Sequence, residues 1–530
     1  MQQSDRSHYR AWHMTGVGFE NLKREVCPHP RIGPDEILLR QRVVTICYSS
    51  IKVLFSGNSH PRLAGRDLCK QPVVLGDECY GEVVEVGVNL RGRYKVGDLV
   101  AVSPDLDVDA FGYGVPGGAQ QLNVIRGKML DFLLKVPRAA VRKYGMFAMP
   151  LSEPLACVER ALSLEYRDAP KPDGRTLVVA DAGAGAFDFG KVKLPRTVTL
   201  VEEGGRCGAV RKELRRLGVS VRALAGKPPV AHGKEKWDDI LVVGSRAEFV
   251  TRAVEQGQKR LAKFGVLAIL GDPPEGCRVP VDLGLAHYER LLIVGSKRGD
   301  VRDAYRRNRR FGLRRGGRVL LFGSGGPMGQ FFLMRVASER TKTPGEILAA
   351  EIKPDRVRNL RRIVRGLKTR SKVRVLDVSG KPERIAPGIR GIDTLVVLTN
   401  DLEALERWLP SLAENAVVNA FAGLSGKAIM VSARDVVRRG VRVIGHSGST
   451  LGHQRKTLRA ITTGKVDVAP VVAAVGGFDS IHDALQAAHT GRFPGKSVIY
   501  MDVDYPLTPL AKLTGGREWS AADERRFLRR

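Results

Sequence analysis

Short apolar runs alternate with segments of helical spacing from about residue 174 to residue 445. The runs are rich in Val, Leu and Ile and are bounded by Gly, Asp or Arg. Such runs, separated by helical segments, predict a parallel sheet that is covered by helices on both faces. The predicted strands are 176–180, 198–202, 239–244, 265–270 and 290–295, then 319–322, 347–351, 393–398, 416–421 and 441–445.

The last five of these strands repeat the first five in the same order and with similar spacing. A period of about 145 residues is too long for a solenoid repeat. We therefore predict an internal duplication, with a first copy over 170–312 and a second copy over 316–461.

The segments 36–56 and 73–103 have a different pattern, because β-branched residues there are punctuated by glycine without helical spacing. This pattern predicts a β-rich N-terminal domain over 1–165. We expect a return segment at 462–503 to complete this domain, and the tail at 504–530 to form a charged surface helix.

The second copy opens with a strand that runs into Gly323-x-Gly325-x-x-x-Gly329 at the start of a helix. Gly323 permits a tight turn, Gly325 lets the backbone approach a pyrophosphate, and the helix N-terminus attracts the phosphate charge. Glu351 ends the next strand, where a carboxylate would bind the ribose of NAD. The third glycine comes one residue late, so a glycine turn of another α/β fold is the alternative. The predicted cofactor-binding residues are Gly323, Gly325, Gly326, Met328, Gly329, Glu351, Ser447 and Ser449.

The first copy lacks these glycines. Ala180, Ala182 and Ala186 take the three places, and Asp181 adds a negative charge that would repel a pyrophosphate. Each added methyl group stands where backbone must approach phosphate closely or take a positive φ. We predict that the second copy binds the dinucleotide and that the first copy has lost this site.

Composition predicts several folded domains. The chain has 530 residues and 43% hydrophobic content, and roughly three domains of about 150 residues are expected. No window approaches the about 18 apolar residues of a membrane span. The seven cysteines form no C-x-x-C pair, which argues against a disulfide scaffold or a four-cysteine zinc site. Because the N-terminus also lacks the apolar core of a signal peptide, we expect a cytoplasmic protein.

The formal net charge of +31 is extreme, and arginines cluster at 302–315 and 356–374. Solvated helix faces are the favoured interpretation. Steering of an anionic substrate comes second, and binding of nucleic acid comes third. Few aromatic residues lie near these arginines, so the stacking platform of single-strand binders is missing.

Four segments carry a resemblance to a known family: 46–52, 73–103, 152–157 and 443–451. They resemble the GroES-like catalytic domain and the nicotinamide-side loop of medium-chain, zinc-type alcohol dehydrogenases. The pattern is most similar to polyol and sugar or sugar-phosphate dehydrogenases. Together with the internal duplication, the resemblance implies an α/β protein with a GroES-like β-rich catalytic domain plus two tandem Rossmann-type doubly wound parallel sheets. It also implies a homo-oligomer, a dimer or tetramer, with dimers paired through the edges of the Rossmann sheets.

The resemblance further implies one catalytic zinc ion, held by Cys47, Asp77, Glu78 and Glu153, and no structural zinc, because 104–120 contains no cysteine. Cys47, Ser49 and Glu78 are the implied catalytic residues, with Ser49 relaying a proton from the substrate alcohol. Asp77 stands where the family has histidine, so the site would be net negative and its bound water a weaker acid. The alternatives are a structural cysteine for Cys47 and a helix N-terminal carboxylate for Glu153.

The predicted activity is NAD(P)-linked oxidation of a polyol, sugar or sugar phosphate. Glu351 favours NAD, whereas Lys353 and Arg356 leave NADP open. Lys52 and Arg62 are candidates for holding a substrate phosphate, and His60 is interpreted as a solvated loop histidine. The alternative is a catalytically degenerate relative that binds partners through its basic surface.

Overall fold

The computed structural model describes residues 7–104, 110–183, 187–188, 190, 192–223, 235–379, 388–424 and 426–529. The chain forms two compact units. Unit 1 comprises residues 1–160, 326–338 and 448–530, and unit 2 comprises 161–325 and 339–447. Within the described ranges we find no helix with the length and apolar character of a membrane-spanning segment.

Unit 1 is built around an eight-stranded sheet with the order β24-β22-β23-β3-β4-β5-β7, in which β6 pairs with β3. A separate ribbon pairs β1 with β2. The strands are β1 (His8–Met14), β2 (Leu22–Pro28), β3 (Glu36–Thr45), β4 (Glu78–Val86), β5 (Leu99–Val102), β6 (Leu122–Arg126), β7 (Leu133–Lys135), β22 (Val472–Gly477), β23 (Lys496–Tyr500) and β24 (Thr508–Pro509). The helices are α1 (Tyr48–Ser56), α2 (Arg138–Tyr144), α3 (Ser152–Ala161), α8 (Pro327–Ala337), α12 (Leu451–Thr462), α13 (Ile481–Thr490), α14 (Leu510–Thr514) and α15 (Ala521–Phe527).

The C-terminal segment returns to the sheet of the N-terminal strands, because β23 pairs antiparallel with β3. The tail forms α15, which was expected as a charged surface helix. Arg525 and Arg526 are exposed as expected, but the opposite face of the helix is buried, and Glu524 accepts hydrogen bonds from the backbone of Met146 and Phe147 and from the Tyr500 hydroxyl. The apolar Trp519 and Phe527 are also buried, which anchors a segment whose composition suggested solvent exposure.

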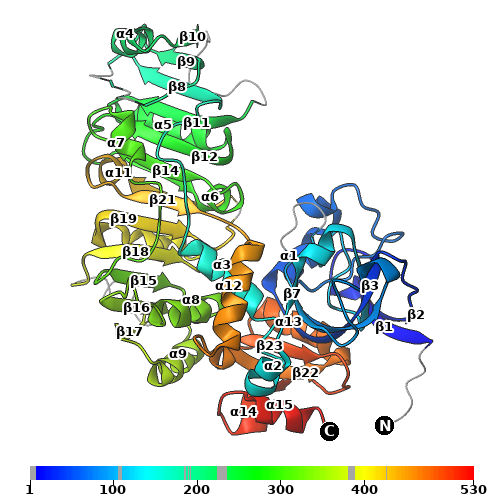
Figure 1. Cartoon of the computed structure of the whole chain (residues 1–530). Helices are drawn as coiled ribbons and strands as arrows, with labels where there is room; N and C mark the ends of the chain where they lie inside the picture. Colours follow the sequence, from blue (N-terminus) through cyan, green and yellow to red (C-terminus); the bar gives the residue numbers. More distant parts are fainter. Residues whose placement is uncertain are drawn as a thin grey trace. The chain divides into compact units, whose positions relative to one another are not determined.

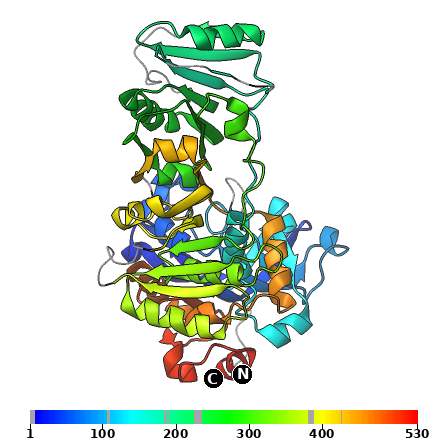
Figure 2. The same cartoon turned by 90° about the vertical axis from the view of Figure 1, so that its left-hand side faces the viewer.

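Unit 2 contains one twelve-stranded sheet with the order β10-β9-β8-β11-β12-β14-β21-β19-β18-β15-β16-β17 (Figures 1 and 2). The strands are β8 (Thr176–Asp181), β9 (Thr197–Glu203), β10 (Ser220–Ala223), β11 (Trp237–Val243), β12 (Leu261–Leu270), β14 (Leu292–Ser296), β15 (Arg318–Phe322), β16 (Glu346–Glu351), β17 (Lys372–Asp377), β18 (Ile392–Val397), β19 (Leu412–Ala420) and β21 (Arg442–Gly445). A separate ribbon pairs β13 (Arg278–Asp282) with β20 (Ala428–Ser432). The helices are α4 (Gly208–Arg216), α5 (Ala247–Gln258), α6 (Leu283–Tyr288), α7 (Val301–Tyr305), α9 (Pro354–Gly366), α10 (Leu402–Glu406) and α11 (Ala433–Arg438).

Both faces of this sheet are buried, which explains why its interior strands are apolar throughout. Along β8, Leu177 and Val179 join one core cluster, whereas Val178 and Ala180 join another. Successive side chains of a strand point to opposite faces, so each face must be covered by helices. Helix α5 covers the first face with residues such as Phe249, and α4 and α7 cover the second.

The two predicted copies are both doubly wound, and their sheets meet edge to edge. Within each copy the described strand pairings are parallel. Between the copies, β14 pairs with β21 in the antiparallel direction. The two copies therefore form one continuous sheet, a junction that the periodicity of the sequence did not reveal.

The basic segments lie on solvated faces. Helix α9 buries Val357, Leu360 and Ile363 and exposes most of its arginines. In the segment 302–315 the arginines are exposed, and buried aromatic and aliphatic residues alternate with them. This pattern agrees with the favoured interpretation of the net charge as solvated helix faces.

Candidate functional site

The predicted metal ligands gather at one end of the unit 1 sheet. Cys47 caps the N-terminus of α1 directly after β3, and Asp77 and Glu78 stand at the start of β4. Because Thr45 at the end of β3 pairs in register with Glu78, the two strand ends bring these side chains together. Glu153 enters from the first turn of α3.

A buried ion pair stabilises this group. The Lys496 ammonium, at the start of β23, donates hydrogen bonds to Glu78 Oε1 and to the Ile46 carbonyl, and Thr45 donates to Glu78 Oε2. The side chain of Lys496 is 4% exposed and that of Glu78 is 0% exposed. Burial alone would lower the pKa of Lys496, but the attraction of Glu78 and the neighbouring anionic groups raises it. Both carboxylate oxygens of Glu78 therefore have partners within the protein.

Asp77 is less completely satisfied. Its Oδ2 accepts a hydrogen bond of 2.6 Å from the Ser49 hydroxyl, and Ser49 also hydrogen-bonds with Tyr113. Its Oδ1 is buried and finds no hydrogen-bond partner among the described residues. Burial, followed by repulsion from Glu78, raises the pKa of Asp77 to about 6. A buried carboxylate oxygen without a partner is costly unless a proton or a cation reaches it.

Cys47 and Glu153 complete the group. Burial, followed by repulsion from Asp77 and then Glu78, raises the pKa of the Cys47 thiol well above its usual value. The same causes raise the pKa of Glu153, which accepts a hydrogen bond of 3.6 Å from the Cys157 thiol. A divalent cation would reverse these shifts, because it stabilises the thiolate and the carboxylates together. The donor set of one sulfur and several carboxylate oxygens fits zinc, although histidine is missing.

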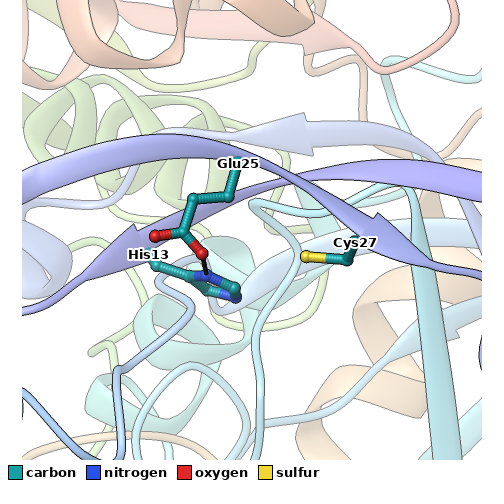
Figure 3. Close-up of side chains that lie close together, drawn as sticks. All are labelled: His13, Glu25 and Cys27. Carbon is teal, nitrogen blue, oxygen red and sulfur yellow. Dashed lines mark hydrogen bonds and ion pairs between the residues drawn. The ribbon is translucent and has the colours of Figure 1, made fainter.

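Another cluster of ligand-type side chains is more compact than the one at Cys47. Among the described residues, His13, Glu25 and Cys27 form the one group of three or more ligand-type side chains whose ligand atoms all lie within 4.8 Å of one another (Figure 3). The ligand atoms of Cys47, Asp77, Glu78 and Glu153 are further apart than this. Zinc at Cys47 would therefore have to draw these side chains closer together.

Basic and aromatic side chains lie beside the Ser49–Asp77 pair. The Arg62 guanidinium lies over the Tyr113 ring at 4.8 Å, and the rings of His60 and Tyr113 are 5.4 Å apart. Burial, followed by the positive charges of Arg62 and Lys52, lowers the pKa of His60. His60 is half-buried against Tyr113, whereas the sequence suggested a solvated loop histidine.

In unit 2 the glycine loop has the predicted form. Gly323 has φ +87°, and a Cβ there would lie 2.6 Å from the Cβ of Thr399. A Cβ on Gly325 would lie 2.4 Å from Glu351 Oε2 and 2.6 Å from the Cβ of Arg356. The Gly325 amide donates a hydrogen bond of 2.8 Å to Glu351 Oε2, so the predicted ribose-binding carboxylate lies at the loop.

The remaining predicted cofactor residues are split between the two units. Gly326 caps the N-terminus of α8, whose first turn contains Met328 and the buried Gly329. Ser447, in unit 2, accepts a hydrogen bond of 3.0 Å from Arg290 at its carbonyl. Ser449, in unit 1, is buried, and its carbonyl accepts a hydrogen bond of 3.1 Å from Arg160.

In the first copy the strand pairings correct the sequence alignment by one residue. The neighbouring strands β11 and β18 both end in Leu-Val-Val. Ala180 pairs with Val243, the last valine in β11, and Phe322 pairs with Val397, the last valine in β18, so Ala180 corresponds to Phe322. Asp181 therefore stands at the place of Gly323, and Gly183 at the place of Gly325. The prediction had set Ala180 and Ala182 there, and Ala186 lies outside the described residues.

The loop of the first copy is filled by its own ion pairs. Asp181 Oδ2 accepts a hydrogen bond of 2.6 Å from Arg246, and Asp181 Oδ1 accepts one of 2.9 Å from the Gly183 amide. Glu203, which takes the place of Glu351, forms ion pairs with Arg246 and Arg252. A buried carboxylate at the strand end occupies the region where a pyrophosphate would need amide donors.

Sequence reasoning missed three residues of the unit 1 site: Thr45, Tyr113 and Lys496. Tyr113 falls in a segment that was notable only for lacking cysteine. Lys496 stands 418 positions after Glu78, and no pattern distinguishes a buried lysine from a solvated one. An apolar strand that begins with lysine was the only signal.

The family described as the alcohol dehydrogenase GroES-like domain matches residues 33–138. Uncharacterized protein YggP of Escherichia coli (strain K12) is 26% identical over 322 residues, covering 54% of this chain and 73% of that protein. Mannitol-1-phosphate 5-dehydrogenase of Aliivibrio fischeri (strain ATCC 700601 / ES114) is 26% identical over 320 residues, covering 54% of this chain and 74% of that protein.

Solved structures show the same fold. The crystal structure of 2R,3R-butanediol dehydrogenase from Bacillus subtilis aligns with a TM-score of 0.54 at 15% identity, covering 93% of this chain and 100% of that chain. Together with the family match, this likeness confirms the predicted α/β fold class with a GroES-like domain. Residues 33–138 match the GroES-like domain of alcohol dehydrogenases, and the relatives and solved structures support the predicted place in the medium-chain dehydrogenase/reductase superfamily, near its polyol dehydrogenases.

Proposed function

We propose that the protein is an NAD(P)-linked oxidoreductase that transfers a hydride between nicotinamide and a secondary alcohol of the polyol, sugar or sugar-phosphate class. One observation carries the proposal: the buried Asp77 has one oxygen on Ser49 and the other without a partner among the described residues, beside Cys47 and Glu153. A cation at this position would satisfy the orphaned oxygen. The similarity to mannitol-1-phosphate 5-dehydrogenase supports the substrate class.

Cys47, Asp77 and Glu153 would hold a zinc ion, and Glu78 would stay behind them, paired with Lys496. When bound, zinc would polarise the alcohol oxygen and favour the alkoxide near neutral pH. Ser49 Oγ would accept the proton of the alcohol and pass its own proton to Asp77 Oδ2, to which it is already hydrogen-bonded. Tyr113 would orient the Ser49 hydroxyl, because the two side chains share a hydrogen bond.

The positive charge beside this network favours an anionic substrate. Arg62 lies over the Tyr113 ring, and Lys52 contributes to the same field, as their effect on His60 indicates. A sugar phosphate would place its phosphate near these cations while its hydroxyl group reaches Ser49.

The second copy would supply the dinucleotide site through Gly323 and Gly325, with Glu351 for the ribose. The same carboxylate favours NAD over NADP, because it would repel a 2′-phosphate. We propose that the first copy binds no dinucleotide, since Asp181 and Arg246 fill its loop.

A cofactor-coupled screen tests the function. Purified protein is mixed with polyols and sugar phosphates, with NAD or NADP, with and without added zinc, and nicotinamide reduction is followed by absorbance. We expect turnover that depends on zinc. A Cys47→Ser variant should reduce the turnover rate at least tenfold, because it removes the thiolate ligand. Cys69→Ser is the matched control, since Cys69 is exposed and its thiol donates a hydrogen bond to the Thr15 carbonyl.

Metal analysis and nicotinamide titration separate this function from the alternative. About one zinc ion per chain bound at Cys47 and a measurable affinity for dinucleotide would support the oxidoreductase. If native protein bound neither zinc at Cys47 nor a dinucleotide, a degenerate relative that binds partners through its basic surface would be favoured.

A further inference from the structure

The junction between the two copies in unit 2 has approximate twofold symmetry. The strand order on one side of the β14–β21 pair mirrors the order on the other side. In the β14–β21 pair Ile293 faces Val443, and in the β13–β20 ribbon Pro280 faces Met430. Both pairs join residues that are 150 positions apart, so each residue faces its own counterpart in the other copy. One twofold axis therefore relates both ribbons.

Hydrogen bonds and backbone angles repeat the symmetry. The Leu283 amide donates to the Lys427 carbonyl, and the Ala433 amide donates to the Cys277 carbonyl, both at 3.0 Å. Leu283 and Ala433 are 150 positions apart, and so are Cys277 and Lys427. The twofold symmetry therefore converts one of these hydrogen bonds into the other. Arg290 has φ 57° and its counterpart Gly440 has φ 65°, both in the left-handed region.

A contact in which each residue meets its own counterpart is the kind that two identical subunits make in a symmetric dimer. In this protein a single chain forms both halves of the contact, the first copy one half and the second copy the other. A single core cluster runs through the junction and contains Val281, Ile293, Val431 and Val443. The ion pair between Arg438 and Asp272 also crosses it, at 2.7 Å.

We infer that the first copy is a built-in partner subunit. It has given up the dinucleotide site and covers the β21 edge of the second copy, so no second chain can pair there. The protein should therefore be a monomer, in place of the dimer or tetramer that the family resemblance suggested. An uncovered edge strand would expose unpaired backbone groups and invite association, which explains why the first copy is retained.

Two measurements on the full-length protein test this inference. Sedimentation equilibrium at micromolar concentration should give one species at the chain mass of 58.0 kDa. A Leu292→Cys/Ile444→Cys variant should form a disulfide under mild oxidation, because these residues face each other in the β14–β21 register. The product should migrate as a monomer without reducing agent. A species of twice the mass, or a disulfide that links two chains, would overturn the inference.

A second inference concerns a candidate metal site on the β1–β2 ribbon of unit 1, formed by His13, Glu25 and Cys27. Tyr9 pairs with Cys27, and Ala11 pairs with Glu25, in an antiparallel register. Alternate residues share a face, so His13, Glu25 and Cys27 project on the same side (Figure 3). His13 Nδ1 and Glu25 Oε2 are 2.7 Å apart.

We propose that this cluster binds a zinc ion, which would be distinct from the ion proposed at Cys47. Imidazole nitrogen, thiolate sulfur and carboxylate oxygen are the three ligand types that zinc prefers, and a water molecule would complete four-coordination. The antiparallel ribbon holds all three on one face, and Glu25 is exposed enough for an ion to enter. Zinc would replace the proton shared by His13 and Glu25 and would displace the thiol proton of Cys27.

Titration of full-length protein with Co²⁺ tests this site, because thiolate–cobalt bonds absorb in the near ultraviolet. Cys27→Ser should lose one equivalent of this absorption, and His13→Gln should weaken the same equivalent at least tenfold. Cys69→Ser should leave the spectrum unchanged, and Cys47→Ser should remove only the other equivalent. If Cys27→Ser binds cobalt with the native spectrum and stoichiometry, the site does not exist. Loss of dehydrogenase turnover in Cys47→Ser alone would leave this conclusion unaffected.

Discussion

Replacing Lys496 by methionine should lower the free energy of unfolding of unit 1 by about 3–5 kcal/mol. The substitution keeps most of the apolar stem and removes the ammonium, so the buried carboxylate of Glu78 loses its ion pair. Glu78 is fully buried. Of the two described side chains that donate hydrogen bonds to it, Lys496 and Thr45, only Thr45 would remain. An unpaired buried charge costs far more than an exposed salt bridge contributes.

Calorimetry measures this effect. A midpoint shift of about 2–4 °C per kcal/mol for a unit of this size predicts a fall of roughly 6–20 °C. Lys512→Met is the matched control, because Lys512 is an exposed lysine of α14 and should shift the midpoint by less than about 2 °C. The double variant Lys496→Met/Glu78→Gln should recover part of the loss, because it removes the charge that Lys496 neutralises. Equal midpoints for Lys496→Met and Lys512→Met would show that the pair contributes nothing.

The interior strands of the twelve-stranded sheet could be predicted because burial on both faces makes them apolar throughout. Each of the ten predicted runs forms a strand within a few residues of its expected place. The edge strands β10 and β17 were missed, since their solvent-facing positions carry charged residues such as Arg222 and Arg374. The β13–β20 ribbon was missed as well, because its partner strands are far apart in the sequence and each is only five residues long.

The sequence alone could not determine which residues correspond in the two glycine loops. The first copy reads Ala180-Asp-Ala-Gly183, a run of small residues that can be matched to Gly323-x-Gly325 in more than one way. The strand pairings determine the correspondence, and they make Asp181 the counterpart of Gly323. The prediction that the first copy has lost its dinucleotide site therefore rests on the carboxylate of Asp181 and not on an added methyl group.

In the unit 1 site, sequence matching predicted Cys47, Ser49, Asp77, Glu78 and Glu153, and the structure places them at one end of the sheet. It could not predict the partners that fix their charge states. Lys496 and Tyr113 reach the site from β23 and from the loop before β6, and their side chains have ordinary neighbours in sequence. Which carboxylate is paired and which oxygen is left for a cation follows only from the packed structure.

Gly325→Ala should weaken dinucleotide binding at least a hundredfold. The added Cβ would lie 2.4 Å from Glu351 Oε2 and 2.6 Å from the Cβ of Arg356, so the loop and the carboxylate proposed to bind the ribose must both move. The methyl group also stands where the backbone would approach the pyrophosphate. Calorimetric or fluorescence titration with NAD and with NADP measures the affinity, and circular dichroism verifies that the variant is folded.

The duplicated fold supplies the control for this variant. Gly183 is the counterpart of Gly325 in the first copy, and among the described residues a Cβ there would meet only Asp181 Oδ1, at 3.7 Å. Gly183→Ala should therefore leave the affinity unchanged, because the methyl group fits and because we propose that this loop binds no dinucleotide. If Gly183→Ala weakened binding as much as Gly325→Ala, the first copy would be a working site. If neither variant weakened it, the dinucleotide would bind elsewhere, and the assignment of the second copy would fail with it.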